Sequence, residues 1–289
     1  MVNFTKYRWL YFFISALVIG IGLFSLIKWG YRYSIEFVGG TQLEYQLSRE
    51  ASIQEIRKIF IENGAEIVEI LLEGKNLSVR TKAINEKKEL GIRTALEKNL
   101  SIRIDILRIE TVGPTLGKEM VRKTLVAALL ATLGILIYMI YAFKGINYAA
   151  AAIIANLHDL IVVVGSYSLL SHFFKAEVDT MFVTAVLTTM SFSLHDTIVI
   201  FDKIREYRHS GSNEKIEYYA NKALTETMVR SINNSMTILF MLLSLTLLGG
   251  STIRFFIITL LIGTITGTYS SPFVATPILV WLEKRKIKG

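Results

Sequence analysis

Six apolar stretches, each about 20 residues long, constrain the fold of this chain more than any other feature. A run of that length crosses the hydrocarbon core of a bilayer as an α-helix, because a helix satisfies its own backbone hydrogen bonds. Hydrophobic residues make up 52% of the chain and the mean hydropathy is +0.45, as in a membrane protein. Pro272 and Pro277 predict a kink in the last span. The predicted spans are 9–29, 125–143, 148–170, 180–201, 231–248 and 255–282.

Basic residues gather at one set of span ends and predict how the chain is inserted. The net charge is +8, and most of the excess falls where the first span begins, where the fourth ends and where the sixth ends. Lysine and arginine near span ends mark the cytoplasmic side, so both termini are expected there. This distribution suits anionic lipid headgroups and argues against a nucleic-acid partner. The residues include Lys6, Arg8, Lys203, Arg205, Lys284 and Arg285.

The hydrophilic segment 30–120, between the first two spans, has the rhythm of a compact α+β domain. Its elements are predicted in the order β-α-β-β-α-β, which is typical of the ferredoxin-like fold. Ser52 is the expected N-cap of its first helix, and Gly74 the turn of its hairpin. The chain has no cysteine, and this segment has neither histidine nor a phosphate-binding glycine pattern. It therefore reads as a binding or packing module and not as an enzyme, with no cofactor expected. The predicted elements are strand 41–47, helix 52–61, strands 67–72 and 77–81, helix 85–99 and strand 101–110.

The predicted organisation is thus a first span at 1–29, the extracytoplasmic domain at 30–120 and a five-span bundle at 121–289. Within the bundle, residues 203–228 are expected to form a cytoplasmic loop.

One carboxylate, Asp196, falls inside the fourth span and is the main functional clue. A charge at membrane depth costs at least ~2.5–3.5 kcal/mol, and such residues usually move a proton, an ion or a substrate. Asp196 lies roughly 10 Å from the cytoplasmic end of its helix, too deep for its short side chain to reach water. Thr189, Ser193 and Asp196 follow helical spacing and predict one polar stripe. The competing interpretation is a structural hydrogen bond between helices.

A second polar stripe, on the fifth span, supplies a partner. Arg230, Asn233, Asn234 and Thr237 follow helical spacing. Because an arginine keeps its charge, Arg230 opposite Asp196 would stabilise the carboxylate and release it when it is protonated. The alternative for Arg230 is an ordinary anchor at the cytoplasmic surface.

His158 and Asp159 lie in the third span and predict either a proton relay or a polar contact between spans. Together with His195-Asp196 they form two His-Asp pairs, a combination that also suggests metal. No three-ligand helical spacing such as His-Glu-x-x-His accompanies them, so no metal site is expected.

Small residues at three places predict backbone roles. Gly39-Gly40 and Gly113-Pro114 bracket the segment 30–120 at its two membrane junctions, where hinges are expected. The last span carries a face of small residues that favours close helix packing. These residues are Gly263, Gly267, Ser270 and Ser271.

These motifs resemble the SecF branch of the SecD–SecF family of bacterial protein secretion, over essentially the whole chain. The fourth-span string from Leu194 to Glu206 and the sixth-span string Gly-Thr-Tyr-Ser-Ser are the most specific together. The remaining matches are Phe37–Thr41, Val112–Glu119, His158-Asp159 and Arg230–Thr237. The chain departs from the usual family pattern at His195, commonly asparagine, and at Asn234, usually threonine.

The resemblance implies one half of a SecD–SecF pair related to the RND transporters, with six spans and one periplasmic ferredoxin-like domain. It implies a proton-driven helper of the SecY-E-G translocon in the inner membrane, whose partners are SecD, unfolded preprotein and protons. Asp196 falls at the family's proton-carrying aspartate and Arg230 at its associated arginine. Two alternatives stay open: a subunit of a small-molecule RND-type exporter, and a purely structural clamp of the translocon.

Overall fold

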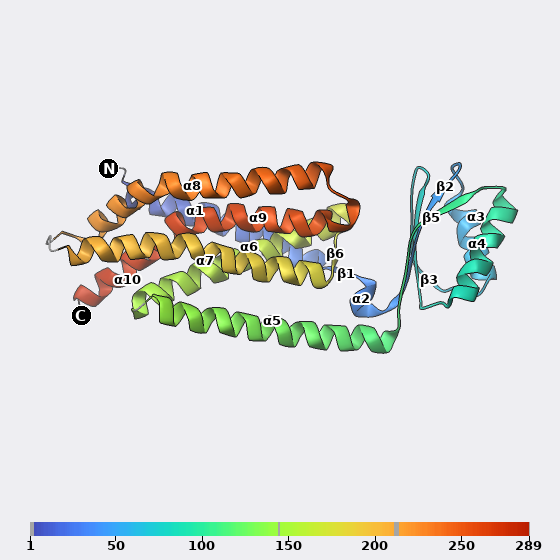
Figure 1. Ribbon diagram of the computed structural model, residues 1–289, viewed down its shortest axis with the longest axis horizontal. Coiled ribbons are helices and arrows are strands. Elements are labelled where there is room, and N and C mark those ends of the chain that lie inside the picture. The colour runs from blue at the N-terminus through green and yellow to red at the C-terminus, as the bar shows by residue number, and fades with distance from the viewer. Residues whose placement is uncertain (1–2, 144, 211–213, 289) are drawn as a thin grey trace. The chain divides into compact units, whose positions relative to one another are not determined.

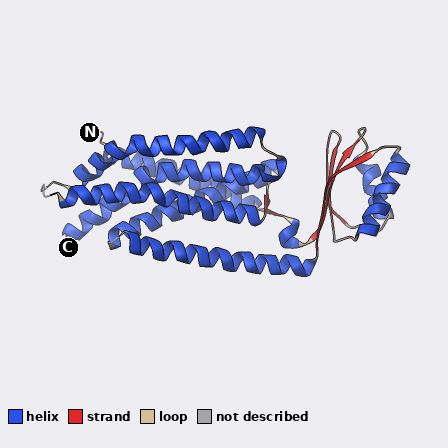
Figure 2. Ribbon diagram, viewed as in Figure 1, coloured by secondary structure: helices blue, strands red, loops and turns tan. Residues whose placement is uncertain are grey.

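The computed structural model of the chain describes residues 3–143, 145–210 and 214–288. They form two compact units: Met1–Arg32 with Val126–Gly289, and Tyr33–Leu125. Helices dominate the first unit, and the four-stranded sheet lies in the second (Figure 2).

The first unit is a bundle of long helices (Figure 1). Six helical stretches among the described residues are long and apolar enough to cross a membrane, the number predicted from the sequence. Two-residue strands, β1 (Arg32–Tyr33) and β6 (Glu177–Val178), pair with each other. The helices are α1 (Arg8–Trp29), α5 (Pro114–Ala142), α6 (Ile146–Phe174), α7 (Thr180–His209), α8 (Ile216–Leu248), α9 (Arg254–Ser270) and α10 (Thr276–Lys288), with 3-10 turns at Phe4–Tyr7 and Ser251–Ile253.

The spans differ sharply in how much of their surface the bundle covers. About half of the most apolar stretch of α6 and of α7 is buried (50% each), and 56% of that in the last span. The corresponding share is only 6% for α5 and 11% for α8. Helices α6, α7 and α9 therefore form the centre of this unit, whereas α5 and α8 leave wide faces uncovered.

Much of the segment 203–228, predicted as a cytoplasmic loop, is helical, since helix α7 continues to His209 and α8 already begins at Ile216. Ion pairs along the turn stabilise the end of α7, with Arg205 2.6 Å from Asp202 and Lys203 3.0 Å from Glu206. The start of α8 buries an apolar face at helical spacing, comprising Ile216, Tyr219, Ala220, Ala223 and Leu224. Residues 211–213 of the predicted loop lie outside the described residues.

The last span is irregular at the place where the sequence predicts a kink. Helix α9 ends at Ser270, a π-helical turn occupies Ser271–Ala275, and α10 continues from Thr276. Pro272 lies inside that turn and has no backbone N–H to donate, so the regular hydrogen-bond ladder is interrupted there.

The second unit has the predicted element order, β-α-β-β-α-β. Its antiparallel sheet has the strand order β3-β4-β2-β5, so β2 pairs with both β4 and β5. Helices α3 and α4 cover the same face of the sheet (Figure 1), and Leu43 and Tyr45 of β2 are fully buried beneath them. The elements are α2 (Ile35–Val38), β2 (Gly40–Leu47), α3 (Ile53–Glu62), β3 (Ile67–Glu73), β4 (Asn76–Thr81), α4 (Glu86–Leu100) and β5 (Ile104–Val112).

Local signals at the ends of these elements hold in part. Gly74 has a φ of +60°, which suits glycine, and it makes the β3–β4 turn. Asn85 caps α4 by accepting from the Lys88 N–H at 2.9 Å. The predicted cap at Ser52 is wrong in its chemistry, since Ser52 precedes α3 but its side chain makes no cap bond. The short helix α2 was not predicted, and the unit extends to 33–125 instead of the predicted 30–120.

Candidate functional site: two carboxylates inside the bundle

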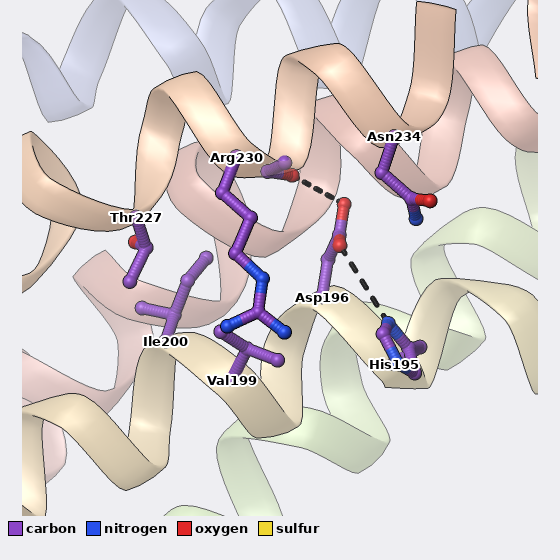
Figure 3. A pocket seen from close by; sticks show the side chains of 8 residues that line it. His195, Asp196, Val199, Ile200, Thr227, Arg230 and Asn234 are labelled. Carbon is purple, nitrogen blue, oxygen red and sulfur yellow. Dashed lines mark hydrogen bonds and ion pairs between the residues drawn. The ribbon is translucent and has the colours of Figure 1, made fainter. Parts of the chain in front are cut away.

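Asp196 lies on α7 and faces a cavity of about 180 Å³ between α7 and α8. It is 7% exposed, so its carboxylate is almost fully removed from the surroundings of the bundle. The Ser231 hydroxyl of α8 donates a hydrogen bond to Asp196 Oδ2, and His195 Nδ1 lies 3.9 Å from Oδ1 (Figure 3). The Asp196 carboxylate therefore has one hydroxyl donor from α8 and a cavity at its side.

Arg230 enters the same cavity from α8, opposite Asp196 (Figure 3). Among the described residues no ion pair or hydrogen bond joins the two side chains, and Asp196 is held by Ser231 instead. The sequence analysis missed Ser231. The helical spacing of Thr227, Ser231 and Asn234 could have identified Ser231, because it places the three polar side chains on one face of the helix. All three line the cavity.

The rest of the predicted stripe on α8 divides between two environments. Asn234 lines the cavity, and Asn233 and Thr237 are exposed. The Thr237 hydroxyl donates to the Asn233 carbonyl of its own helix at 2.9 Å. The face of α8 around the cavity therefore keeps amide groups exposed within a span.

Asp159 of α6 forms a second and more enclosed site, 3% exposed. Three side chains from three helices hydrogen-bond to its carboxylate. His158 Nδ1 lies 2.9 Å from Oδ1, Ser270 Oγ lies 2.6 Å from Oδ2, and Ser193 Oγ also donates to Oδ2. This arrangement fastens α6, α7 and α9 together at one point, because each donor would be left unpaired in an apolar interior if the carboxylate moved.

The predicted stripe grouped Ser193 and Thr189 with Asp196. In the structure neither side chain bonds Asp196. Ser193 bonds Asp159, and the Thr189 hydroxyl donates to the Val186 carbonyl of its own helix at 2.9 Å. Positions 193 and 196 lie about 60° apart around a helix, so different neighbours cover them, and Thr189 lies about 10 Å from Asp196 along the helix axis.

The small residues of α9 explain how closely α9 approaches α7. Gly263 lies directly under the Thr189 side chain, and a Cβ added at Gly267 would lie 3.0 Å from Ser193 Cα. Ser271 exchanges a hydrogen bond of 2.7 Å with Thr197 of α7. A similar approach joins α1 and α6, where Gly22 and Gly165 meet backbone to backbone; this pair was not predicted.

No cluster of three or more His, Asp or Glu side chains suited to a metal ion occurs among the described residues. Each histidine lies beside the aspartate that follows it in the sequence. His158 bonds Asp159, and His195, with a side chain 64% exposed, lies beside Asp196.

Comparison with known proteins places this arrangement in a family. The family described as "Protein export membrane protein SecD/SecF, C-terminal" matches residues 92–285. Protein translocase subunit SecF of Thermobaculum terrenum is 37% identical, over 99% of this chain and 95% of its own length. The SecF subunit of Anaerolinea thermophila is 35% identical, over 98% and 94%. The chain belongs to the SecD/SecF family.

In larger members of the SecD/SecF family, one part of the protein is similar to this chain. The SecDF protein of Bacillus subtilis is 30% identical over 99% of this chain, which spans 39% of its length. The crystal structure of SecDF from Thermus thermophilus, a translocon-associated membrane protein, matches with a TM-score of 0.84 and 28% identity. That match covers 98% of this chain and 39% of the solved one.

Two of the glycines expected to be hinges in this SecD/SecF member, Gly39 and Gly40, have packing roles within the second unit. Gly39 and Gly40 have φ values of +76° and +131°, and a Cβ on Gly40 would lie 2.6 Å from the Thr81 carbonyl oxygen. A Cβ on Gly39 would lie 3.0 Å from Pro114 Cα. Gly113 has open space, and Pro114 is the first residue of α5, where proline is well tolerated. Hinge motion at these residues stays a prediction.

Proposed function

We propose that this chain is an accessory subunit of protein export, which acts with SecD and uses proton passage at Asp196 to promote preprotein movement. The observation that carries the proposal is the cavity in which Asp196 of α7 and Arg230 of α8 face each other inside two spans. Membership of the SecD/SecF family supports the link to export.

In this proposal Asp196 gains and loses the proton, and Arg230 keeps its charge throughout. Ionised Asp196 accepts from Ser231 and lies in the field of the Arg230 guanidinium, which keeps its charge. When Asp196 takes up a proton, its attraction to Arg230 disappears and its bond to Ser231 weakens. Because Ser231 and Arg230 both belong to α8, each proton changes the forces between α7 and α8.

A second chain is expected against α5 and α8. Most of the apolar stretch of both helices is uncovered, and Asn233, Asn234 and Thr237 expose polar groups within a span, where contact with lipid is unfavourable. The chain spans 39% of the SecDF proteins it matches, which supports SecD as the partner that covers these faces. The SecY-E-G translocon and an unfolded preprotein complete the proposed assembly, since the Thermus protein is described as translocon-associated.

The proposed placement is a bacterial inner membrane with both termini cytoplasmic and the second unit in the periplasm. Lysine and arginine near the span ends support it: Lys6 precedes α1 and Arg8 begins it, and Lys203 and Arg205 lie in the last turns of α7. The exporter alternative is not retained, because the relatives named above are protein translocase subunits.

Asp196→Asn tests the proposal in cells that depend on this chain together with SecD. The variant keeps a hydrogen-bond acceptor for Ser231 but cannot carry a proton, so we expect it to insert normally and to lose the export that depends on the proton gradient. Asp202→Asn is the matched control, because it makes the same change two helical turns along α7 at an exposed ion pair with Arg205. Normal export with Asp196→Asn would contradict the proposal and favour the structural clamp.

A further inference from the structure

One nitrogen of a buried histidine has no partner in the structure. His158 of α6 is 8% exposed, and its Nδ1 lies 2.9 Å from Asp159 Oδ1. Beside an ionised Asp159, which only accepts, Nδ1 of a neutral ring is the donor and Nε2 is the acceptor. Nε2 is buried and has no hydrogen-bond partner among the described residues. A charged ring would bury an unpaired N–H at the same place, which is no better.

His158 lines a cavity of about 330 Å³ between α1, α6 and α9 of the first unit. The other walls are mainly aliphatic and come from Ile14 and Val18, from Val162, and from Ile262 and Ile265. A largely apolar cavity of this size with a few fixed polar groups is the usual form of a small-molecule site between helices.

Three of the four hydroxyl groups of the cavity already donate elsewhere, and the fourth, on Ser166, makes no hydrogen bond among the described residues. Thr266 Oγ1 donates to the Ile262 carbonyl at 2.8 Å, and Tyr269 OH donates to the Tyr11 carbonyl at 2.8 Å. Ser15 Oγ points to Tyr269 OH at 3.5 Å. None of these hydroxyl groups donates a hydrogen bond to His158 Nε2, which is left without a donor.

We propose that this cavity binds a neutral amphiphile with an apolar body and a single hydroxyl group, which donates its hydrogen bond to His158 Nε2. The aliphatic walls disfavour a charged ligand, and the unmet acceptor selects a donor over a pure hydrocarbon or an ether. The walls are transmembrane helices, so the ligand arrives through the bilayer. Once bound, it fixes the His158 ring with Nδ1–H toward Asp159, and so connects the cavity to the Ser193–Ser270 junction. The inference does not rest on the proposed function.

The native full chain in lipid nanodiscs tests this with 1-octanol and methyl octyl ether as probes. The chain has four histidines, so ¹⁵N-histidine labelling gives a spectrum simple enough to follow His158. We expect 1-octanol to shift the His158 Nε2 resonance saturably, and the ether to bind about five- to tenfold more weakly and to leave that resonance in place. Equal responses to the two probes, or no response to 1-octanol, would overturn the proposal.

Variants locate the site. His158→Leu assigns the resonance and should abolish the preference for the alcohol over the ether, read from competition with a photoreactive octanol. His172→Leu is the control on the same helix, because His172 is exposed, stacks on Trp29 at 4.1 Å and lies outside the cavity. Ser166→Phe places a ring into the cavity and keeps His158, so it should remove octanol binding even where His158→Leu does not fold. Unchanged octanol binding in Ser166→Phe would contradict the assignment.

Discussion

Asp159 and Asp196 are both carboxylates inside spans, yet their surroundings differ. Asp159 is held by three donors from three helices, whereas Asp196 has one strong donor and a cavity at its side. The first arrangement suits an anchor, and the second leaves space for the protonation change that we propose for Asp196. The sequence could identify both residues, because a charge within a span is costly. It could not tell them apart, since that difference depends on which neighbouring helix covers each side chain.

Asp159→Asn should therefore lower the stability of the folded chain. An amide offers one acceptor oxygen to three donors and turns its NH₂ toward hydroxyl groups, so we expect a loss of about 1–3 kcal/mol in the free energy of unfolding. Denaturation in detergent micelles, followed by circular dichroism, measures it. Asp202→Asn serves as the control and should change stability by less than about 1 kcal/mol. Equal losses for both variants would contradict the anchoring role.

At the scale of the elements, helix existence followed from the sequence and helix extent did not. The apolar runs show only the part of each helix inside the bilayer, whereas α7 and α8 continue in polar sequence that local ion pairs and an amphipathic face support. The small residues of the last span predicted a close helix contact, and the structure places that contact between α9 and α7. The Gly22–Gly165 contact was not, because two isolated glycines on different helices carry no spacing signal.

Gly263→Ala tests the close approach of α9 to α7. The added methyl group overlaps the Thr189 side chain, so the helices must shift, and we expect a destabilisation of about 1–3 kcal/mol. Gly20→Ala on α1 is the matched control, because nothing lies within 4 Å of its added Cβ, and it should be neutral or slightly stabilising. The same denaturation measurement compares the two. A harmless Gly263→Ala would mean that α7 and α9 are packed more loosely than described.

At the scale of the whole molecule, the two-part organisation was the most secure inference from the sequence. Six long apolar runs and one hydrophilic segment with alternating strands and helices predict a bundle of spans and a separate α+β unit. The structure adds the order of the strands in the sheet of that unit. What the sequence could not supply are the pairings between remote segments, such as Asp196 with Ser231 and Asp159 with Ser270, because they depend on how the spans assemble.

The proposed topology is directly testable because the chain has no cysteine of its own. Lys75→Cys places a thiol on the exposed β3–β4 turn, and Ser210→Cys places one at the end of α7. A membrane-impermeant maleimide added to cells with a permeable outer membrane should label the first thiol at once and the second only after the inner membrane is opened. The reverse pattern would invert the proposed orientation.

Proton flux through membranes that hold this chain together with SecD tests the central claim most directly. In liposomes with an imposed pH gradient and a pH-sensitive dye inside, the native pair should conduct protons. Asp202→Asn should conduct like the native pair, and Asp196→Asn should fall to the level of empty liposomes. Undiminished flux in Asp196→Asn would contradict the assignment of Asp196 as the proton carrier.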